Sequence, residues 1–406
     1  MTERRLLTET IDRCPYDFYD EIRNEGVTWD ESANAWLAPT FAATKQVYLD
    51  EQRFRRSTAV GLSGPEFERV LGTGSLLSKF GEDRTIFRKW WLSLFRPRQI
   101  EELRTGLSAD VIARAIDTFA YAGKAELVSQ YTDPVATCIV AGLLGLPWDD
   151  DSWMSDLMAP LNFLEDYRGM VHVTPDASDH AGALDATYRV DEVLRPFVER
   201  ARKGEVPGVL ARIWSDPELV DFSEEERLGV LRTFFLAGRQ STRTSLTNSF
   251  WLIFNTPGLA DRLRTGSEEE LAVFVEESLR IYGTAQFRSR VAAADTELEG
   301  TLIREGERVI AMNGSANRDP QQFTCPADID FDRPNPRQHL AFSVGSGACV
   351  GSSLARHELR EGVMGLLQAI PDVRLDDSMP APQPRGFGLK MFAPLHVEFT
   401  PATDPR

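Results

Sequence analysis

The sequence predicts a mainly α-helical protein with a minor β part. Three observations predict this class. A long, uninterrupted helical pattern runs through the middle of the chain. Two further helices with recognisable boundaries follow it. Short β-type segments lie between and after those helices, without the regular strand–helix alternation of a dinucleotide-binding fold.

The longest helix is expected over residues 223–256. Ser223 precedes three glutamates, which is a favourable start, and Asn255 and Pro257 form a favourable stop. No proline interrupts the segment. At 1.5 Å per residue such a helix is about 45 Å long, so we expect it to cross the middle of the molecule.

The later elements follow from capping and turn signals. Ser267 and Glu270 form a capping-box pattern at the start of a second helix, and a third helix is expected over 352–370. The β-type segments are 288–292, 308–312 and 396–399. Prolines cluster at 326–336 and 380–394, where we expect the chain to turn.

Composition excludes several functional classes. The chain has 406 residues, 42% of them hydrophobic, and a net charge of −17, which argues against a nucleic-acid binder or a protein of anionic membranes. No apolar run is long enough to span a bilayer, and the first residues lack the apolar core of a signal peptide. Four widely spaced cysteines indicate reduced thiols in the cytoplasm, and the five histidines form no zinc motif.

The most informative segment surrounds Cys349. It reads Leu340-Ala-Phe-Ser-Val-Gly-Ser-Gly-Ala-Cys-Val-Gly351 and immediately precedes the third helix. Glycines allow the backbone to approach a flat ligand, and a helix N-terminus stabilises a thiolate. A thiolate here suits a metal ligand or a nucleophile. For this loop alone, a buried structural cysteine in a tight turn remains the plainer interpretation.

The loop resembles the signature F-G-x-G-x-[H/R]-x-C-x-G of the cytochrome P450 family, at Phe342, Gly345, Cys349 and Gly351. It departs at Ser343, where glycine is usual, and at Gly347, where a basic residue usually contacts a haem propionate. Two further matches stand upstream in the expected order. They are the E-x-x-R pair Glu277 and Arg280, and the arginine Arg333 that completes the family's structural triad. The resemblance covers nearly the whole chain and weakens before residue 80 and across 150–215.

The resemblance implies a single cytochrome P450 domain over residues 1–406. Haem b lies between the long central helix and the cysteine loop, and Cys349 is its axial iron ligand. Arg84 and Arg88 match the family's H-x-x-x-R pair, with arginine in the first position, and Arg290 matches another propionate-binding arginine. We hypothesise that Arg84 supplies the charge that Gly347 lacks; the alternative is a solvated basic helix face.

The family's central helix carries [A/G]-G-x-[D/E]-T-[T/S], whose acid and alcohol assist proton delivery to oxygen. This chain reads Ala237-Gly-Arg-Gln-Ser-Thr242. Gly238 is retained and leaves room for oxygen or substrate. Gln240 replaces the acid, and Ser241, followed by Thr242, replaces the threonine. Arg239 lies roughly 100° away around the helix and is a poor substitute for the acid.

Three interpretations of this departure stay open. Ser241, Thr242 and ordered water still relay protons; a substrate group supplies the missing acid; or the enzyme catalyses peroxide-driven, radical-coupling, cyclisation or rearrangement chemistry. A non-catalytic ligand-binding member is a further class. The first is preferred: a monooxygenase that oxidises a small organic molecule, of a kind found in specialised metabolism.

The resemblance also implies partners and a pocket. Electrons from NAD(P)H arrive through a ferredoxin reductase and an acidic ferredoxin, which we expect to dock on basic residues near the cysteine side of the haem: Lys89, Arg96, Arg98 and Arg356. The candidate pocket segments are 58–78, 160–175, 284–287 and 387–392.

Overall fold

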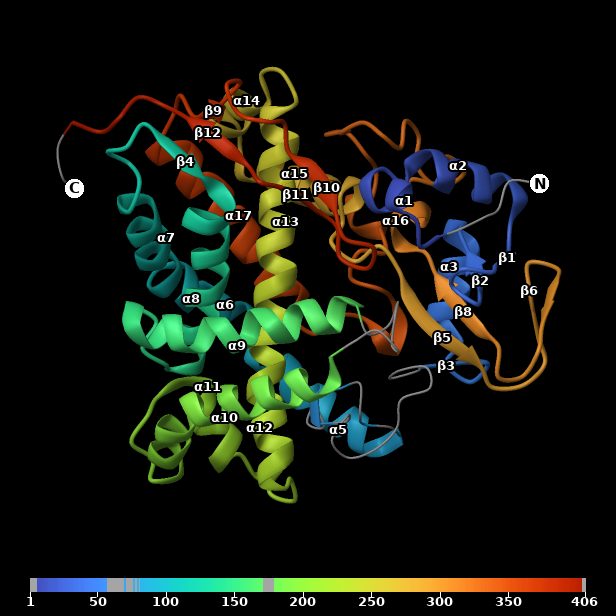
Figure 1. Ribbon diagram of the computed structural model, residues 1–406, viewed down its shortest axis with the longest axis horizontal. Coiled ribbons are helices and arrows are strands. Elements are labelled where there is room, and N and C mark those ends of the chain that lie inside the picture. Colours follow the sequence, from blue (N-terminus) through green and yellow to red (C-terminus); the bar gives the residue numbers. More distant parts are fainter. Residues whose placement is uncertain are drawn as a thin grey trace.

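The computed structural model describes residues 6–56, 69, 70, 76, 79, 81–170 and 179–403, and only the backbone of 168–170. Helices fill most of the molecule, and the strands of the largest sheet lie on its right-hand side (Figure 1). The fold is thus mainly α with a minor β part, as the sequence predicts. No helix in the described part of the chain combines the length and apolar character needed to cross a membrane.

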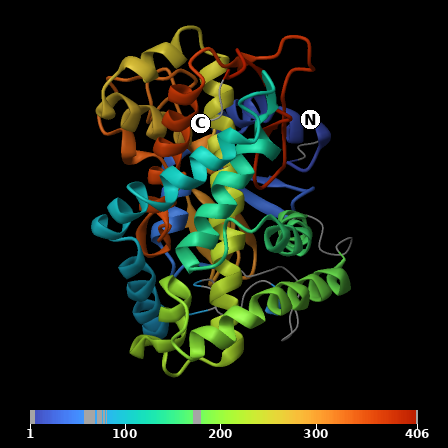
Figure 2. The ribbon, with the colours of Figure 1, turned by 90° about the vertical axis from the view of Figure 1, so that its left-hand side faces the viewer.

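The central helix crosses the whole molecule (Figures 1 and 2). It begins with α12 (Glu224–Thr233) and ends with α13 (Gln240–Phe254), and the predicted capping by Ser223 is present as a full capping box with Glu226. The prediction of a single long helix is confirmed with one difference. Residues Phe234–Arg239 form a π-helical segment between the two α-helical parts.

Two hydrophobic clusters lie along the central helix. Its first half contributes Leu231 and Phe235 to a cluster with α5, α8, α9, α10 and α11, and its second half contributes Leu246 and Phe250 to a cluster with α7, α15 and α17. The bounds are α5 (Gly81–Leu94), α7 (Leu107–Asp117), α8 (Asp133–Leu144), α9 (Asp151–Met170), α10 (His180–Arg202), α11 (Gly208–Ser215), α15 (Glu268–Ile281) and α17 (Ser352–Ala369). The central helix therefore joins both halves of the apolar core.

The helices predicted at Ser267 and Ser352 are both present. Ser267 caps α15 with the reciprocal hydrogen bonds of a capping box, and α17 starts directly after Gly351. The remaining helices are short or peripheral: α1 (Glu9–Arg13), α2 (Tyr16–Glu25), α3 (Phe41–Leu49), α6 (Pro97–Arg104), α14 (Leu259–Thr265) and α16 (Asn313–Ala316).

The largest sheet has the strand order β1-β2-β8-β5-β3. Only β2 and β8 pair in parallel; the other neighbours are antiparallel. Its strands are β1 (Thr28–Asp30), β2 (Ala35–Ala38), β3 (Phe54–Arg56), β5 (Arg288–Ala292) and β8 (Arg308–Ala311). The two β-type segments predicted near 288 and 308 are thus adjacent strands.

Smaller sheets complete the β part. A three-stranded sheet has the order β4-β12-β9, and β6–β7 and β10–β11 form hairpins. The bounds are β4 (Lys124–Glu126), β6 (Thr296–Leu298), β7 (Thr301–Ile303), β9 (Arg374–Leu375), β10 (Gln383–Arg385), β11 (Met391–Ala393) and β12 (His396–Glu398). The segment predicted near 396 is β12.

Candidate active site

The cysteine loop is a compact turn before the N-terminus of α17. The Cys349 N–H donates to the Phe342 carbonyl at 2.9 Å, and Gly345 has a φ of +69°, which glycine adopts at little cost. A short 3₁₀ turn spans Gly345–Gly347. The Cys349 side chain is accessible rather than packed into the core. This favours a ligand or nucleophile at Cys349 over a structural cysteine in a tight turn.

The surroundings of Cys349 suit a metal-bound thiolate. Desolvation raises the pKa of the Cys349 thiol above its ordinary value, while the Gly351 N–H and the charges of Arg288 and Arg88 act to lower it. The desolvation outweighs these groups, so a bare thiolate is disfavoured. A coordinated metal cation reverses the balance, because it deprotonates a bound thiol.

Two arginines of α5 hold the loop on either side of Gly347. Arg84 donates to the Ser346 carbonyl at 2.8 Å, and Arg88 donates to the Ala348 carbonyl at 2.7 Å. Arg290 lies on β5, with its guanidinium 5.2 Å from the ring centre of Tyr48. The backbone of Tyr48 in turn lies against Gly345 of the loop, so the three arginines that the sequence assigns to the propionates all lie near the cysteine loop.

These arginines fit an anionic ligand. The Nε atoms of Arg84 and Arg290 are buried and have no hydrogen-bond partner within the described residues. Burial and neighbouring positive charge lower the pKa of both side chains. Unpaired buried donors are costly, and the two carboxylates of haem would satisfy them.

The predicted structural triad is formed. Arg280 donates twice to Glu277, and Arg333 donates once, each at 2.8 Å, and all three side chains are buried. Arg280 also donates to the carbonyls of Asn317, Pro326 and Asp328. The triad thereby ties α15 to the proline-rich segment that leads into the cysteine loop.

Phe342 begins the loop and packs against a charged cluster. The guanidinium of Arg356 lies 4.6 Å from the Phe342 ring centre and pairs with Glu276 at 2.6 Å. His339 also contacts Glu276, at 2.9 Å, and these partners lower the pKa of Glu276 to about 2. Glu276 thus engages Arg356 within the protein, and the contact of Arg356 with a ferredoxin stays a prediction.

The central helix presents Ala237 and Ser241 on one accessible side. The Ser241 hydroxyl donates to the Ala237 carbonyl at 2.7 Å, and Ala237 is exposed although it lies in the middle of the helix. A Cβ on Gly238 would lie 3.1 Å from Val140 of α8, so this glycine allows the two helices to pack closely. Its expected role in leaving room for oxygen or substrate stays a prediction.

Arg239 points away from that side. It is fully buried and pairs with Asp133 of α8 at 2.8 Å and with Glu165 of α9 at 2.7 Å. Its position in the π-helical segment brings it to both helices. The expectation that Arg239 does not replace the missing acid is therefore confirmed. Gln240, which stands where the acid is usual, is partly exposed.

Thr242 contacts an acid that the sequence analysis missed. Its hydroxyl donates to Glu358 of α17 at 2.8 Å, and burial raises the pKa of Glu358 to about 8. The second carboxylate oxygen of Glu358 has no partner within the described residues. Thr242 thus links the central helix to the helix that follows Cys349.

The structure describes two of the four candidate pocket segments in full, and residues 160–170 of a third. Residues 284–287 and 387–392 lie side by side through a bridge between Ala285 and Leu389. Thr284, the first residue of the candidate segment 284–287, donates to the Ser241 carbonyl at 3.1 Å. Most of the segment 58–78 and the residues 171–175 lie outside the described residues.

Comparison with known proteins identifies the same family. Residues 209–388 match the family model described as Cytochrome P450. The chain is 30% identical to nocardicin C N-oxygenase of Nocardia uniformis subsp. tsuyamanensis, over 84% of this chain and 83% of that protein. It is 26% identical to the biotin biosynthesis cytochrome P450 of Bacillus subtilis, over 95% and 96% of the two chains.

A solved structure gives the same result. The crystal structure of P450BioI in complex with an acyl carrier protein ligated to hexadec-9Z-enoic acid aligns with a TM-score of 0.82, at 25% identity, over 95% of this chain and 98% of that chain. The fold and the arginine-lined cysteine loop define a haem-thiolate protein. The chain belongs to the cytochrome P450 family, whose members are monooxygenase oxidoreductases that bind haem iron through a cysteine thiolate.

Proposed function

We propose that the protein oxidises a small organic molecule of specialised metabolism, using O₂ and electrons that pass from NAD(P)H through a ferredoxin reductase and an acidic ferredoxin. The observation that carries the proposal is the accessible Cys349 thiol on a loop held by Arg84 and Arg88. When bound, haem supplies the activation of dioxygen, which thiolate ligation promotes. The protein's own residues bind the cofactor, position the substrate and deliver protons.

Ser241 is the proposed proton-handling residue of the central helix. Its hydroxyl proton is engaged by the Ala237 carbonyl, which leaves the oxygen lone pairs to accept from ordered water or from a substrate hydroxyl. Gly238 supports this arrangement indirectly, by letting the helix sit close to α8. Thr242 lies next in the chain and is bonded to Glu358, which keeps its proton at neutral pH.

Gln240 supports a second candidate function. An amide cannot exchange a proton at neutral pH as a carboxylic acid does, so a substrate group could take that role, or the enzyme could perform peroxide-driven, radical-coupling, cyclisation or rearrangement chemistry. Replacing Gln240 with Glu tests whether the missing acid matters. Faster product formation under reductive conditions would show that the missing acid limits turnover, whereas an unchanged rate would show that it does not.

The substrate class is proposed from the relatives and from the segments near the site. Nocardicin C N-oxygenase, a relative of 30% identity, is named for an oxidation of a small organic molecule. Phe387 and Phe392 belong to a segment adjoining 284–287, which suits an apolar or aromatic substrate. We further propose that the chain acts as one domain in the cytoplasm, without nucleic-acid or membrane partners.

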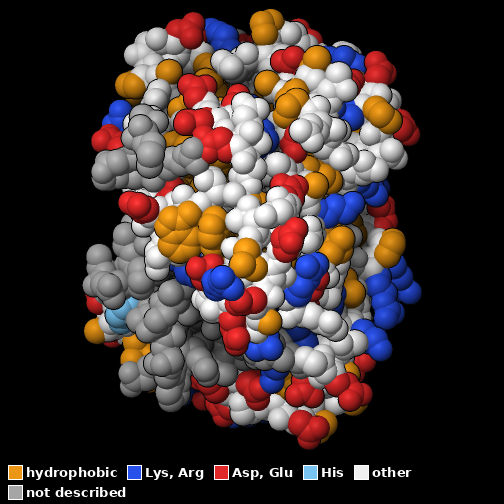
Figure 3. Space-filling view, turned by 90° about the vertical axis from the view of Figure 1, so that its right-hand side faces the viewer, with side chains coloured by type: hydrophobic (Ala, Val, Ile, Leu, Met, Phe, Trp, Pro, Cys, Tyr) orange, Lys and Arg blue, Asp and Glu red, His pale blue; other side chains and the backbone are white. Residues whose placement is uncertain are grey.

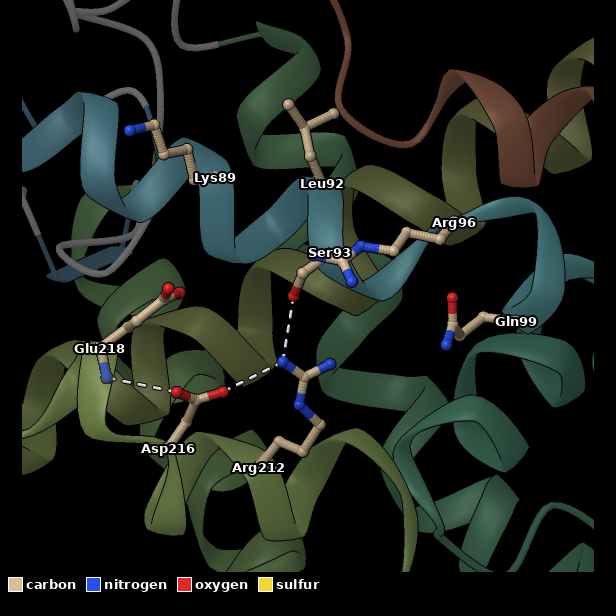
Figure 4. Close-up of a pocket in the computed structure, with 8 residues that line it drawn as sticks. All are labelled: Lys89, Leu92, Ser93, Arg96, Gln99, Arg212, Asp216 and Glu218. Carbon is tan, nitrogen blue, oxygen red and sulfur yellow. Dashed lines mark hydrogen bonds and ion pairs between the residues drawn. The ribbon is translucent and has the colours of Figure 1, made fainter.

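The proposed ferredoxin surface lies beside α5. A surface pocket of about 560 Å³ is lined by Lys89 and Arg96 on one side and by Arg212, Asp216 and Glu218 on the other (Figure 4). Asp216 is neutralised by Arg212 at 3.0 Å, whereas Lys89 and Arg96 form no ion pair with any residue that the structure describes. In Figure 3, basic side chains gather along the right-hand edge of the molecule.

Reversing these charges tests the docking surface. We expect Lys89→Glu with Arg96→Glu to raise the KM for ferredoxin about tenfold or more at low salt, with little change in kcat, because complementary charge steers association. Arg374→Glu is the matched control, because Arg374 is an exposed arginine, paired with Glu398, on β9 at the opposite end of the molecule from α5 (Figure 1). Equal KM values for all three proteins would place the docking surface elsewhere.

The reaction type is tested by comparing oxidants with one substrate panel. Product formation with NADPH, ferredoxin reductase and ferredoxin, and not with peroxide alone, supports the proposed monooxygenase. Product formation with peroxide alone supports the second candidate. Binding of substrates without product under either condition would indicate a non-catalytic member.

A further inference from the structure

Arg56 is a fourth arginine of the cysteine loop, and the sequence gives it no role. It ends β3, which pairs antiparallel with β5 so that Arg56 lies directly opposite Arg290. Opposed residues of such a pair point to the same face of the sheet, and like charges there repel. The charge of Arg56 accordingly lowers the pKa of Arg290, Arg84 and Arg88. Four guanidinium groups thus surround one place in the structure.

The guanidinium of Arg56 fills the space beside Gly347. A Cβ built on Gly347 would lie 2.9 Å from Nη2 of Arg56, closer than real Cβ contacts come. Gly347 does not need glycine for its backbone, because the positive φ of this turn belongs to Gly345. Because glycine has no side chain, position 347 leaves room for the Arg56 guanidinium.

Glu51 fixes Arg56 in this position. The Glu51 carboxylate pairs with the Arg56 guanidinium and accepts a hydrogen bond from Ser346, the residue before Gly347. Arg56 is largely buried, with 12% of its side chain exposed. Glu51 pairs with Arg56 alone, so the four arginines keep an excess of positive charge, which an anionic ligand would balance.

We propose that Arg56 replaces the basic side chain that the family signature carries at the position of Gly347, and that it binds a haem propionate beside Arg290. The inference rests on the haem binding that family membership shows. It also refines the hypothesis about Arg84, whose Nη2 is engaged by the Ser346 carbonyl. Compared with the family signature, the positive charge that binds the propionate is carried by the end of β3 instead of by the cysteine loop.

Haem release measures the role of Arg56 independently of turnover. The ferric holoprotein is mixed with excess apomyoglobin, and haem transfer is followed by absorbance. We expect Arg56→Ser to release haem about tenfold faster than the wild type, because a charge-assisted hydrogen bond is lost. Arg55→Ser is the matched control: Arg55 precedes Arg56 on the same strand but is exposed, so its release rate should stay within about twofold of the wild type.

A charge relocation distinguishes propionate binding from a purely structural role. The double variant, Arg56→Ser with Gly347→Arg, should release haem more slowly than Arg56→Ser alone, because a side chain that is charged at neutral pH then stands on the loop in the space that Arg56 has left. A merely structural Arg56 predicts the opposite, with the double variant at least as fast as Arg56→Ser.

The outcomes separate this inference from the proposed function. If the wild type and Arg56→Ser retain haem equally well, the proposed role of Arg56 is overturned, and the proposed function is not affected. A double variant that is no slower than Arg56→Ser does the same. Wild-type protein that binds no haem overturns the proposed function and the inference together.

Discussion

Ser343 occupies a backbone conformation that suits glycine. Its φ is +57°, and its hydroxyl is buried without a partner among the described residues. A left-handed conformation costs an L-residue about 1–2 kcal/mol, against about 0.5–1 kcal/mol of backbone entropy lost by glycine. We expect Ser343→Gly to raise the free energy of unfolding by roughly 0.5–1 kcal/mol, measured by urea denaturation.

The control for Ser343 is a serine in regular helix. Ser353→Gly, at an exposed position of α17, should lower the free energy of unfolding by about 0.5 kcal/mol. If both substitutions destabilised the protein, Ser343 would not be under backbone strain.

Glu358 should make stability depend on pH. Its pKa rises from 4.5 to about 8 on folding, so between these values the unfolded chain releases a proton that the folded protein keeps. Raising the pH therefore favours unfolding, by about 1.4 kcal/mol per pH unit within this window. Below pH 4.5 the carboxyl is protonated in both states, and the effect vanishes.

Replacing Glu358 with Gln removes this titration. The stability of the variant relative to the wild type should increase by roughly 3 kcal/mol between pH 4.5 and pH 7, whatever constant offset the buried amide introduces. Urea denaturation at a series of pH values measures the difference. Parallel stability curves for the two proteins would show that Glu358 ionises normally in the folded protein.

At the scale of elements, ion pairs between Glu277 and the two arginines Arg280 and Arg333 help to attach α15 to the segment before the cysteine loop. Glu277→Gln leaves Arg280 and Arg333 buried without their carboxylate, and we expect it to lower the free energy of unfolding by about 3–5 kcal/mol. Glu269→Gln, at the exposed start of the same helix, should change it by less than about 0.5 kcal/mol. Equal midpoints in urea would mean that the triad adds nothing to stability.

The elements were largely predictable, because their signals are local. The capping boxes at Ser223 and Ser267 depend on residues three positions apart, and the positions of β5, β8 and β12 followed from short β-branched or apolar runs. The π-helical segment was not predictable. This segment brings Arg239 to Asp133 and Glu165, which are distant in sequence. The hydrophobic periodicity of the central helix does not indicate where the segment lies.

The same distinction holds for the site. Cys349, Arg84, Arg88 and Arg290 were identifiable because they belong to short motifs. Glu358 was not, because its contact with Thr242 joins segments 116 positions apart. Arg56 was not identifiable either, since only the pairing of β3 with β5 and the space beside Gly347 give it a role.

At the scale of the whole molecule, a net charge of −17 conceals local positive charge. The arginines around the cysteine loop come from α5, β3 and β5, and chain folding alone concentrates them at one place. The net charge argues against nucleic acid as a partner but does not reveal this site. An acidic protein thus holds a cationic centre for an anionic cofactor.

The central claim is that Cys349 binds haem iron as a thiolate. The most direct test is the absorbance difference spectrum of the dithionite-reduced protein with carbon monoxide. We predict the Soret band at the position characteristic of thiolate-ligated haem in the wild type, and its loss in Cys349→Ala. A wild-type band at the position of histidine-ligated haem, or a thiolate band that persists in Cys349→Ala, would contradict the account.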